Sequence, residues 1–539
     1  MPSRIALLAL ALAFALPAAA VLPESVQAGL RAASIPPDAM GVVVKRLSDG
    51  ATILEHQGER PMQPASTLKL VTSLAALETL GPTYRGSAEL RATGRVEKGV
   101  LHGELVLKGL GNVDFDWRAL ERMLHLARMH GIEEVRGDLV LDLGFFQPPR
   151  TDLGIAPFDE APEFRYNVIP DALLLNTNLL QLDLASRGDR VNAAITPPLA
   201  DVAIVPQMKL VERRCEDWEN GWVIPEVRER RKGVMQIRLQ GDFPRDCLAE
   251  TAINVIDRVA FAERLFRTLW RGLGGRWSGR AREGDTPAGS RLLAEHRSRA
   301  LADITRDINK RSDNPIARVV FLTLGALSTS PADAPTARRA DAAIRQWLEA
   351  RGIGHRGLVL ENGSGLSRLE RIAPAQLASV LQAGLKSPWA PEFLASLPIV
   401  AMDGGMRNRL RESPAAACAR IKTGTLRDVT AVAGYVTDDT RETYVVVAMV
   451  NHPLAKRQVA RPIVDALIDW VARPRDSPPP GTISTGTALS SITALLTEFS
   501  TRRVSEFLRA DPIMIRSQCR RRAASAMHCA RSPTAVWAA

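Results

Sequence analysis

The chain has 539 residues, of which 46% are hydrophobic and 24% are charged. This composition excludes the fibrous and disordered classes, and the length predicts two or three domains, because a single core stops growing well below this size. The formal net charge of +11 comes mainly from arginine, since only ten of the 70 basic residues are lysine, and such a surface attracts nucleic acid, an anionic membrane face or an anionic polymer.

The first twenty residues have the pattern of a secretory signal peptide. Arg4 is followed by an apolar run to Leu16 and then by Pro-Ala-Ala-Ala, which predicts cleavage after Ala20. The apolar run is too short to span a bilayer. A buried N-terminal helix is the alternative, but the segment has no polar face to turn toward water. We therefore expect an exported protein, and export argues against a nucleic-acid partner.

Export makes disulfide formation possible, and the chain has five cysteines. Cys215 and Cys247 lie in the same middle region and could form a bridge, although their spacing does not establish it. Cys418 lies in an apolar run that looks like a strand and is expected to be a small buried hydrophobe. Neither the cysteines nor the eight scattered histidines have metal-site spacing, so we predict no metal and no cofactor.

Patterns along the chain predict alternating helical and strand-rich regions. The first half predicts a hairpin over residues 40–56, a helix from Ser66 to Leu80 that is apolar around most of its girth, and helices over 117–130 and 257–273 among short strands. Residues 274–289, rich in Gly, Arg and Ser, predict a loop. The second half predicts helices over 300–309, 315–324 and 459–471, and adjacent antiparallel strands over 416–421, 430–436 and 443–450. The composition after residue 475 favours a disordered tail over an amphipathic helix on a membrane.

The Ser66 helix carries a candidate nucleophile together with its own base. Ser66 and Lys69 are three residues apart, so they lie one helical turn apart on the same face. A lysine amine in that position can take the proton of the serine hydroxyl. The pattern alone is weak evidence, because it is expected about once by chance in a chain of this size.

Two later motifs strengthen this interpretation. Ser312, Asp313 and Asn314 lie in the break between two predicted helices, and the run Lys422, Thr423, Gly424, Thr425 ends a predicted strand. Because lysine is rare in this chain, a Lys-Thr-Gly run in such a place is seldom accidental. Asn314 is a fair N-cap for the helix that follows, but if it faces a substrate then Asp313 must cap the helix instead.

The ordered triple Ser-x-x-Lys, Ser-x-Asn, Lys-Thr-Gly resembles that of penicillin-binding proteins and β-lactamases. In this chemistry Ser66 attacks a carbonyl, Lys69 accepts its proton and Ser312 relays it to the leaving amine. Asn314 would hold the substrate's peptide amide, while Lys422, Thr423 and Thr425 would bind its carboxylate. The backbone N–H groups of Ser66 and Thr425, the latter after Gly424, would form an oxyanion hole.

The separation of about 245 residues between Ser66 and Ser312 distinguishes between the classes of enzyme that share these motifs. Class A β-lactamases keep these motifs close and use a Glu-x-x-Leu-Asn-like segment, which is absent between Asn314 and Lys422. The long insertion resembles the class C low-molecular-mass penicillin-binding proteins, the D-alanyl-D-alanine carboxypeptidases and endopeptidases. Further matches are residues 361–368 (Glu-Asn-Gly-Ser-Gly-Leu-Ser-Arg), 434–436 (Gly-Tyr-Val), Tyr166 with Asn167, Ala172 with Leu173, and Asn176.

Two positions depart from the family pattern. Asn362 stands where the family usually has Asp, and Gly111-Asn112-Val113 replaces a usual Gly-Asp-Pro. Both resemble turn positions, so they bear on local geometry rather than on the chemistry.

The resemblance, which covers about residues 22–471, implies an α/β (α+β) fold. It consists of a β-lactamase/transpeptidase-like domain with a five-stranded antiparallel sheet flanked by helices, carrying inserted mixed α/β and β-rich domains. We expect a signal peptide (1–20), a catalytic domain (21–84 and 290–474), an inserted domain (85–180 and 250–289), a nested domain (181–249) and the tail (475–539).

The implied function is that of a periplasmic serine DD-peptidase. It would hydrolyse D-Ala-D-Ala termini or D-Ala crosslinks of peptidoglycan peptides through an acyl-enzyme, and β-lactams would inhibit it. A β-lactamase and a catalytically silent peptidoglycan-binding protein are the alternatives. At most peripheral contact with a membrane is expected, and the sequence leaves the oligomeric state and the carboxypeptidase or endopeptidase preference open.

Overall fold

The computed structural model describes residues 21–153, 161–230, 233–331 and 333–473. The predicted signal peptide and the predicted C-terminal tail lie outside these ranges. None of the helices within them combines the length and the apolar character that a membrane span requires.

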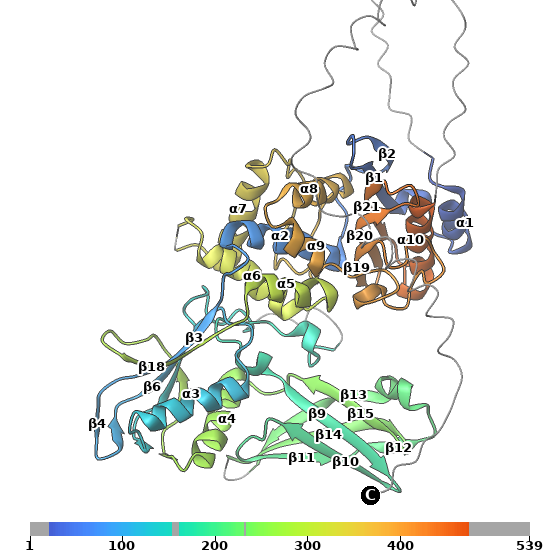
Figure 1. The fold of residues 1–539 in the computed structure, drawn as a ribbon. Helices are drawn as coiled ribbons and strands as arrows, with labels where there is room; N and C mark the ends of the chain where they lie inside the picture. Colours follow the sequence, from blue (N-terminus) through green and yellow to red (C-terminus); the bar gives the residue numbers. More distant parts are fainter. Residues whose placement is uncertain (1–20, 154–160, 231–232, 332, 474–539) are drawn as a thin grey trace, which may run out of the picture. The chain divides into compact units, whose positions relative to one another are not determined.

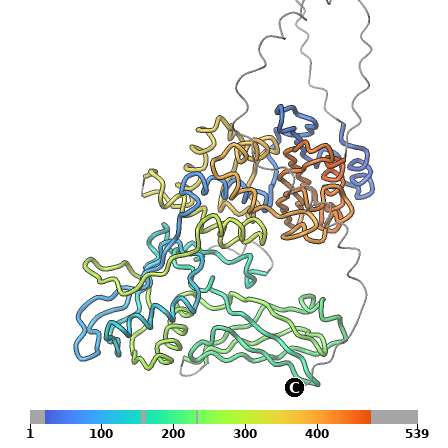
Figure 2. Tube along the Cα trace, viewed as in Figure 1, coloured from blue at the N-terminus to red at the C-terminus, as the bar shows by residue number. Residues whose placement is uncertain are grey.

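Segments from the two ends of the described chain form one five-stranded sheet, in the order β19-β20-β21-β1-β2 (Figures 1 and 2). Every neighbouring pair is antiparallel, which confirms the expected sheet. The strands are β1 (Met40–Arg46), β2 (Thr52–His56), β19 (Arg420–Leu426), β20 (Val429–Thr437) and β21 (Thr443–Asn451).

Alternating side chains of this sheet enter two separate hydrophobic cores, as strand geometry requires. Val43 and Val447 pack in one core with most of the helices, whereas Val42 and Val446 pack in the other with two terminal helices. The first core holds α2 (Lys69–Leu80), α5 (Leu301–Lys310), α6 (Asn314–Ala326), α7 (Thr336–Glu349), α8 (Pro374–Lys386) and α9 (Ala390–Ser396), and the second holds α1 (Glu24–Ala32) and α10 (Arg457–Ala472). All predicted helices are therefore confirmed in this part of the chain.

The chain between α2 and α5 builds its own sheets around a third core. A five-stranded sheet has the order β17-β8-β6-β3-β18, and a small four-stranded sheet has the order β16-β7-β5-β4. Helices α3 (Trp117–Met129) and α4 (Arg258–Gly272) contribute to the same core. The strands are β3 (Ser87–Ala92), β4 (Arg95–Glu97), β5 (Val100–His102), β6 (Leu105–Leu110), β7 (Glu134–Val135), β8 (Leu139–Asp142), β16 (Arg276–Trp277), β17 (Ala281–Glu283) and β18 (Arg291–Arg297).

A β-rich segment lies between β8 and α4 in the sequence. It has a three-stranded sheet, β10-β9-β15, and a four-stranded sheet in which β14 pairs with β11, β12 and β13. Cys215 and Cys247 form a disulfide here, which decides the pairing that the sequence left open. The strands are β9 (Leu180–Arg187), β10 (Arg190–Thr196), β11 (Val202–Pro206), β12 (Lys209–Val211), β13 (Trp222–Glu229), β14 (Met235–Pro244) and β15 (Leu248–Ile253).

Strand pairing differs from sequence expectations at several boundaries. β18 pairs with β3 and β15 pairs with β9, so each strand extends a sheet a few residues past the domain limits expected at 290 and 249. The predicted loop at 274–289 is wrong in part, because β16 and β17 pair in parallel with β7 and β8 there. These strands have two and three residues and form by pairing with strands that are distant in the sequence, so local periodicity does not predict them.

The strand predicted at 416–421 begins only at Arg420. Ala416 and Ala419 instead donate turn hydrogen bonds to the carbonyls of Ser413 and Ala415. Cys418 lies in this turn and is exposed, so the expectation of a buried cysteine is wrong. The apolar composition of the run reflects alanines in a tight turn, not a strand.

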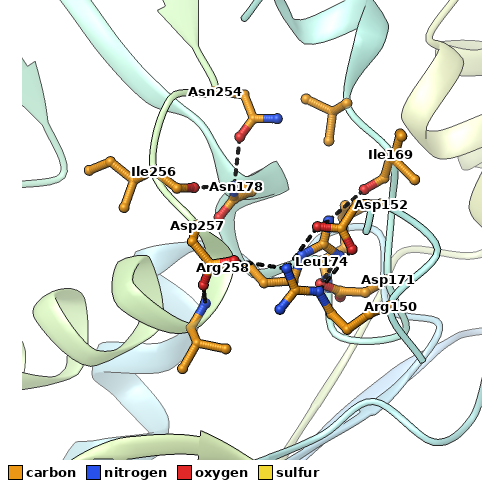
Figure 3. A network of polar contacts seen from close by, with 12 residues as sticks. Arg150, Asp152, Ile169, Asp171, Leu174, Asn178, Asn254, Ile256, Asp257 and Arg258 are labelled. Carbon is orange, nitrogen blue, oxygen red and sulfur yellow. Dashed lines mark hydrogen bonds and ion pairs between the residues drawn. The ribbon is translucent and has the colours of Figure 1, made fainter. Parts of the chain in front are cut away.

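A polar network joins the segments before and after the β-rich strands (Figure 3). Arg258, in the first turn of α4, donates to Asp171 Oδ2 at 2.5 Å and to the Ile169 carbonyl at 3.0 Å. Arg150 bonds both oxygens of Asp152 and also Asp257 Oδ2, each at 2.8 Å. Arginine and carboxylate groups paired in this way are among the stronger hydrogen bonds of proteins. The network holds Ile169 and Asp171, which follow Tyr166 in the chain. Tyr166 itself contacts the site described next.

Candidate active site

Ser66 lies in a short 3₁₀ turn, η2 (Ala65–Leu68), that runs directly into the buried helix α2. Two glycines allow other segments to approach this turn. A Cβ on Gly365 would lie 1.8 Å from the Ala65 carbonyl oxygen, and one on Gly424 would lie 2.9 Å from the Ser66 nitrogen. The serine is therefore enclosed by backbone from two distant parts of the chain.

The Lys69 amine donates to three acceptors. Its Nζ lies 2.9 Å from Ser66 Oγ, 2.5 Å from Asn314 Oδ1 and 2.6 Å from the Ser364 carbonyl oxygen. The side chain is fully buried. Three acceptors saturate the donors of an ammonium group, so Lys69 is held in one orientation beside the serine hydroxyl.

Burial lowers the pKa of Lys69 from the ordinary lysine value to about 7. Desolvation is the dominant cause, and the negative charges of Asp313 and Glu370 oppose it. A substantial fraction of Lys69 is thus neutral near neutral pH. Burial therefore accounts for the lowered pKa of Lys69, against the opposing effect of the two carboxylates.

Ser312 and Asn314 lie at the junction of α5 and α6. Asp313 is the N-cap of α6, because its Oδ1 accepts from the Ile316 N–H at 2.9 Å. Asp313 also accepts two hydrogen bonds from Arg165, at 2.7 and 2.9 Å. Capping by Asp313 leaves the Asn314 amide available for Lys69, which resolves the conflict seen in the sequence.

Strand β19 brings the Lys-Thr-Gly motif to the same place. The buried Lys422 Nζ donates to Ser312 Oγ at 2.9 Å and to the Thr423 carbonyl at 2.8 Å. Desolvation, followed by repulsion from Lys69, lowers the pKa of Lys422 well below its ordinary value. Thr423 is half-buried and Thr425 is exposed at the end of the strand. Contacts thus bring together six of the predicted residues, which come from η2, α2, the α5–α6 junction and β19: Ser66, Lys69, Ser312, Asn314, Lys422 and Gly424. Thr423 and Thr425 lie beside them on β19.

At the α5–α6 junction, Ser312 and Asn314 line a cavity of about 770 Å³ together with Tyr166. A second cavity of about 760 Å³ shares Arg165 and Arg311 with the first. This space is large enough for a peptide of several residues.

Three groups at the site were missed by reasoning from residue types. The Tyr166 carbonyl accepts from Asn314 Nδ2 at 2.9 Å, the Ser364 carbonyl accepts from Lys69, and the buried Glu370 carboxylate faces Lys69. Residues 361–368 were recognised as a family match without a role. A backbone acceptor has no residue-type signature, and Glu370 lies two residues beyond that run.

Within the described ranges, no group of three or more His, Cys, Asp and Glu side chains is placed to hold a metal ion.

Residues 22–473 match the model of the D-Ala-D-Ala carboxypeptidase 3 (S13) family. A D-alanyl-D-alanine carboxypeptidase of Actinomadura sp. (strain R39) is 28% identical over 435 residues, which cover 77% of this chain and 78% of that protein. The D-alanyl-D-alanine carboxypeptidase DacB of Haemophilus influenzae is 26% identical over 423 residues, covering 76% and 85%.

Among solved structures, penicillin-binding protein 4 (dacB) of Haemophilus influenzae superposes with a TM-score of 0.69 at 24% identity, covering 83% of this chain and 98% of that one. This likeness supports the fold, and the match over residues 22–473 includes all three motifs around Ser66. The chain therefore belongs to the D-Ala-D-Ala carboxypeptidase 3 (S13) family of penicillin-recognising serine DD-peptidases.

Proposed function

We propose that this enzyme cleaves the D-Ala-D-Ala terminus or D-Ala crosslinks of peptidoglycan peptides through an ester on Ser66. The observation that carries the proposal is the contact between Lys69 Nζ and Ser66 Oγ at 2.9 Å, made by a lysine whose pKa is lowered to about 7. A neutral amine at this distance is a competent general base for the hydroxyl.

In the acylation step the Ser66 Oγ attacks the carbonyl carbon of the penultimate D-Ala while Lys69 takes the hydroxyl proton. The C–N bond then breaks, and a proton reaches the leaving amine through the Ser312 hydroxyl, which Lys422 holds at 2.9 Å. In deacylation, water attacks the ester carbon and Ser66 recovers its proton. The backbone N–H groups of Ser66 and Thr425 are assigned to the developing oxyanion.

Substrate binding is assigned to the neighbouring polar groups. The Asn314 amide uses one oxygen lone pair for Lys69 and one N–H for the Tyr166 carbonyl, so a second N–H remains for a substrate carbonyl. The Lys422 ammonium and the hydroxyls of Thr423 and Thr425 are assigned to the terminal carboxylate, with Gly424 allowing β19 to approach Ser66. β-Lactams would acylate the same serine, as suggested by the β-lactam complex of Haemophilus influenzae penicillin-binding protein 4, which is 23% identical.

The test is covalent labelling by a fluorescent penicillin, with D-alanine release from a pentapeptide measured in parallel. Wild type should form a long-lived adduct and release D-alanine, and Ser66→Ala should do neither. Equal labelling of the variant would refute the mechanism. Rapid nitrocefin turnover would indicate a β-lactamase, and muropeptide binding without D-alanine release would indicate a silent binder.

Digestion of intact sacculi separates the two peptidase activities. Mass spectrometry of the products would show free D-alanine from a carboxypeptidase and loss of crosslinked dimers from an endopeptidase. The two adjoining cavities that share Arg165 and Arg311 leave room for a crosslinked substrate.

We also propose that the enzyme is periplasmic, delivered by a signal peptide removed after Ala20. The three-domain organisation expected from the sequence is proposed with the boundaries adjusted for strand pairing. β15 would belong to the nested domain and β18 to the inserted domain, which leaves residues 298–473 for the second half of the catalytic domain.

A further inference from the structure

Glu370 is a fully buried carboxylate that the mechanism above does not use. Its Oε1 accepts three consecutive backbone N–H groups, from Glu361 at 3.2 Å, Asn362 at 2.9 Å and Gly363 at 2.8 Å. One oxygen that collects three N–H groups holds their peptide units in a fixed concave arrangement. The side chain therefore determines the shape of the turn at 361–364.

This turn is connected to the catalytic lysine through short hydrogen bonds. Asn362 Oδ1 accepts from the Ser364 N–H at 3.0 Å and from its hydroxyl at 2.6 Å. The Ser364 carbonyl then accepts from Lys69 Nζ at 2.6 Å, and the Gly363 carbonyl accepts from Thr72 Oγ1 on α2 at the same distance. Any change in the turn would therefore move an acceptor that orients Lys69.

The positive charges that face Glu370 are buried. They belong to Lys69 on α2 and Arg318 on α6, whereas Glu361, at the start of Glu370's own turn, is exposed. Lys69 in turn faces Asp313 and Lys422. Because water does not screen the buried pair of Glu370 and Lys69, the negative charge of Glu370 has an appreciable effect on the Lys69 ammonium.

Position 362 carries no charge. The side-chain amide of Asn362 gives the turn a neutral hydrogen-bond acceptor, since its Oδ1 accepts from the Ser364 N–H. The carboxylate of this turn is supplied instead by Glu370, from the other side of the loop.

We infer that Glu370 is a positioning residue of this DD-peptidase, which fixes the Ser364 carbonyl against Lys69 and supplies a buried negative charge to the turn at 361–364. The inference rests on the function proposed above. Glu370 acts through Lys69 and does not touch the substrate.

The inference predicts a direction for the pH dependence. Burial raises the pKa of Glu370, while its three backbone hydrogen bonds and Lys69 oppose that rise. The ionised carboxylate raises the pKa of Lys69. Without this charge Lys69 loses its proton at lower pH, so the acidic limb of the acylation rate should move toward lower pH.

The experiment measures the second-order rate of penicillin acylation as a function of pH for wild type, Glu370→Gln and the double variant Asn362→Asp with Glu370→Gln. Glu370→Gln keeps an oxygen for the three N–H groups but removes the charge. We expect the pH range over which the acylation rate rises to shift downward by about half a pH unit or more in this variant. At the acidic end, its acylation rate relative to its own plateau should then be about threefold higher than that of wild type. The double variant returns a carboxylate to the turn and should move the limb back toward wild type.

A purely structural role of Glu370 predicts a different result. Glu370→Gln would then slow acylation by the same factor at every pH, and the double variant would not return the pH dependence of acylation to that of wild type. That result, or an unchanged profile, would overturn the inference. The charge effect can also be read without activity, because only ten lysines are present. In protein labelled with ¹³C at lysine Cε, with Lys69→Arg as the assignment control, the Lys69 titration should move to lower pH in Glu370→Gln. If wild type forms no acyl-enzyme but this shift is seen, the proposed function fails and the charge coupling stands.

Discussion

Lys422 Nζ donates to Ser312 Oγ at 2.9 Å, across 110 residues of sequence. The contact joins β19 to the junction of α5 and α6, so the two later motifs are hydrogen-bonded directly to each other. Both lysines of the site, Lys69 and Lys422, are buried, and desolvation lowers the pKa of each. The site thus holds two amines that cannot both remain charged without cost.

Removing the Ser312 hydroxyl should slow acylation while the fold is retained. Ser312→Ala deletes the acceptor of Lys422 and the proposed proton relay, and a lost general acid–base group costs about 10²–10⁴-fold in rate. Stopped-flow measurement of penicillin acylation gives the rate, and circular dichroism checks the fold. The matched control is Ser328→Ala just beyond the end of α6, whose hydroxyl donates to the Gly325 carbonyl and accepts from the Ser330 N–H, away from the site. Equal rates for wild type and Ser312→Ala would contradict the relay.

The acylation rate should rise with pH through about pH 7. Below this value Lys69 carries its proton and cannot accept that of Ser66, so the rate should fall about tenfold for each pH unit. Because burial also lowers the pKa of Lys422, loss of its charge should set a falling limb of the rate at a pH below the ordinary lysine value, where Lys422 binds the substrate carboxylate less well. A rate profile measured with a β-lactam and with a peptide checks both limbs. A rate that is flat between about pH 5 and pH 8 would exclude Lys69 as the base.

The three motifs could be predicted from the sequence because each uses residue types with a fixed chemistry. Ser66, Lys69, Ser312 and Lys422 were named correctly as neighbours although they are far apart in the chain. The carbonyl of Ser364 could not be predicted as a ligand of Lys69, because every residue has a carbonyl and only the three-dimensional turn selects this one.

The fold was predictable to a similar extent, and for a related reason. Helices such as α6 and strands such as β21 carry their own hydrophobic pattern, so local sequence predicted them. β16 and β17 carry no such pattern, because they are short edge strands formed by pairing with β7 and β8. The turn that holds Cys418 was mistaken for a strand because alanine runs are apolar in either conformation.

A methyl group at Gly365 should disable the enzyme. The residue has φ of +78°, and a Cβ there would lie 1.8 Å from the Ala65 carbonyl, next to Ser66. Gly365→Ala should therefore cost about 1–2 kcal/mol of backbone strain and about 1–3 kcal/mol of steric overlap, and acylation should fall with it. Gly352→Ala is the matched control, since Gly352 has φ of +65° with open space around its Cβ position. Gly352→Ala should lower the melting temperature only by the amount that the backbone strain causes, and its acylation rate should equal that of wild type. If both variants lost the same stability and kept full activity, the close approach at Ser66 would be refuted.

Loss of the Cys215–Cys247 disulfide should affect stability and not chemistry. The bridge closes a loop of 32 residues in the β-rich segment, and such a crosslink contributes about 2–4 kcal/mol, mainly by restricting the unfolded chain. The double variant Cys215→Ser with Cys247→Ser should therefore unfold at a lower denaturant concentration, while its acylation rate at neutral pH should equal that of wild type. Cys418→Ser is the matched control, because Cys418 is exposed in a turn outside this segment and should change neither quantity. Glu219, which lies inside this loop, lines the cavity beside Ser312. A fall in acylation rate in the double variant, measured under conditions where it is fully folded, would therefore mean that the disulfide holds this wall of the cavity in place.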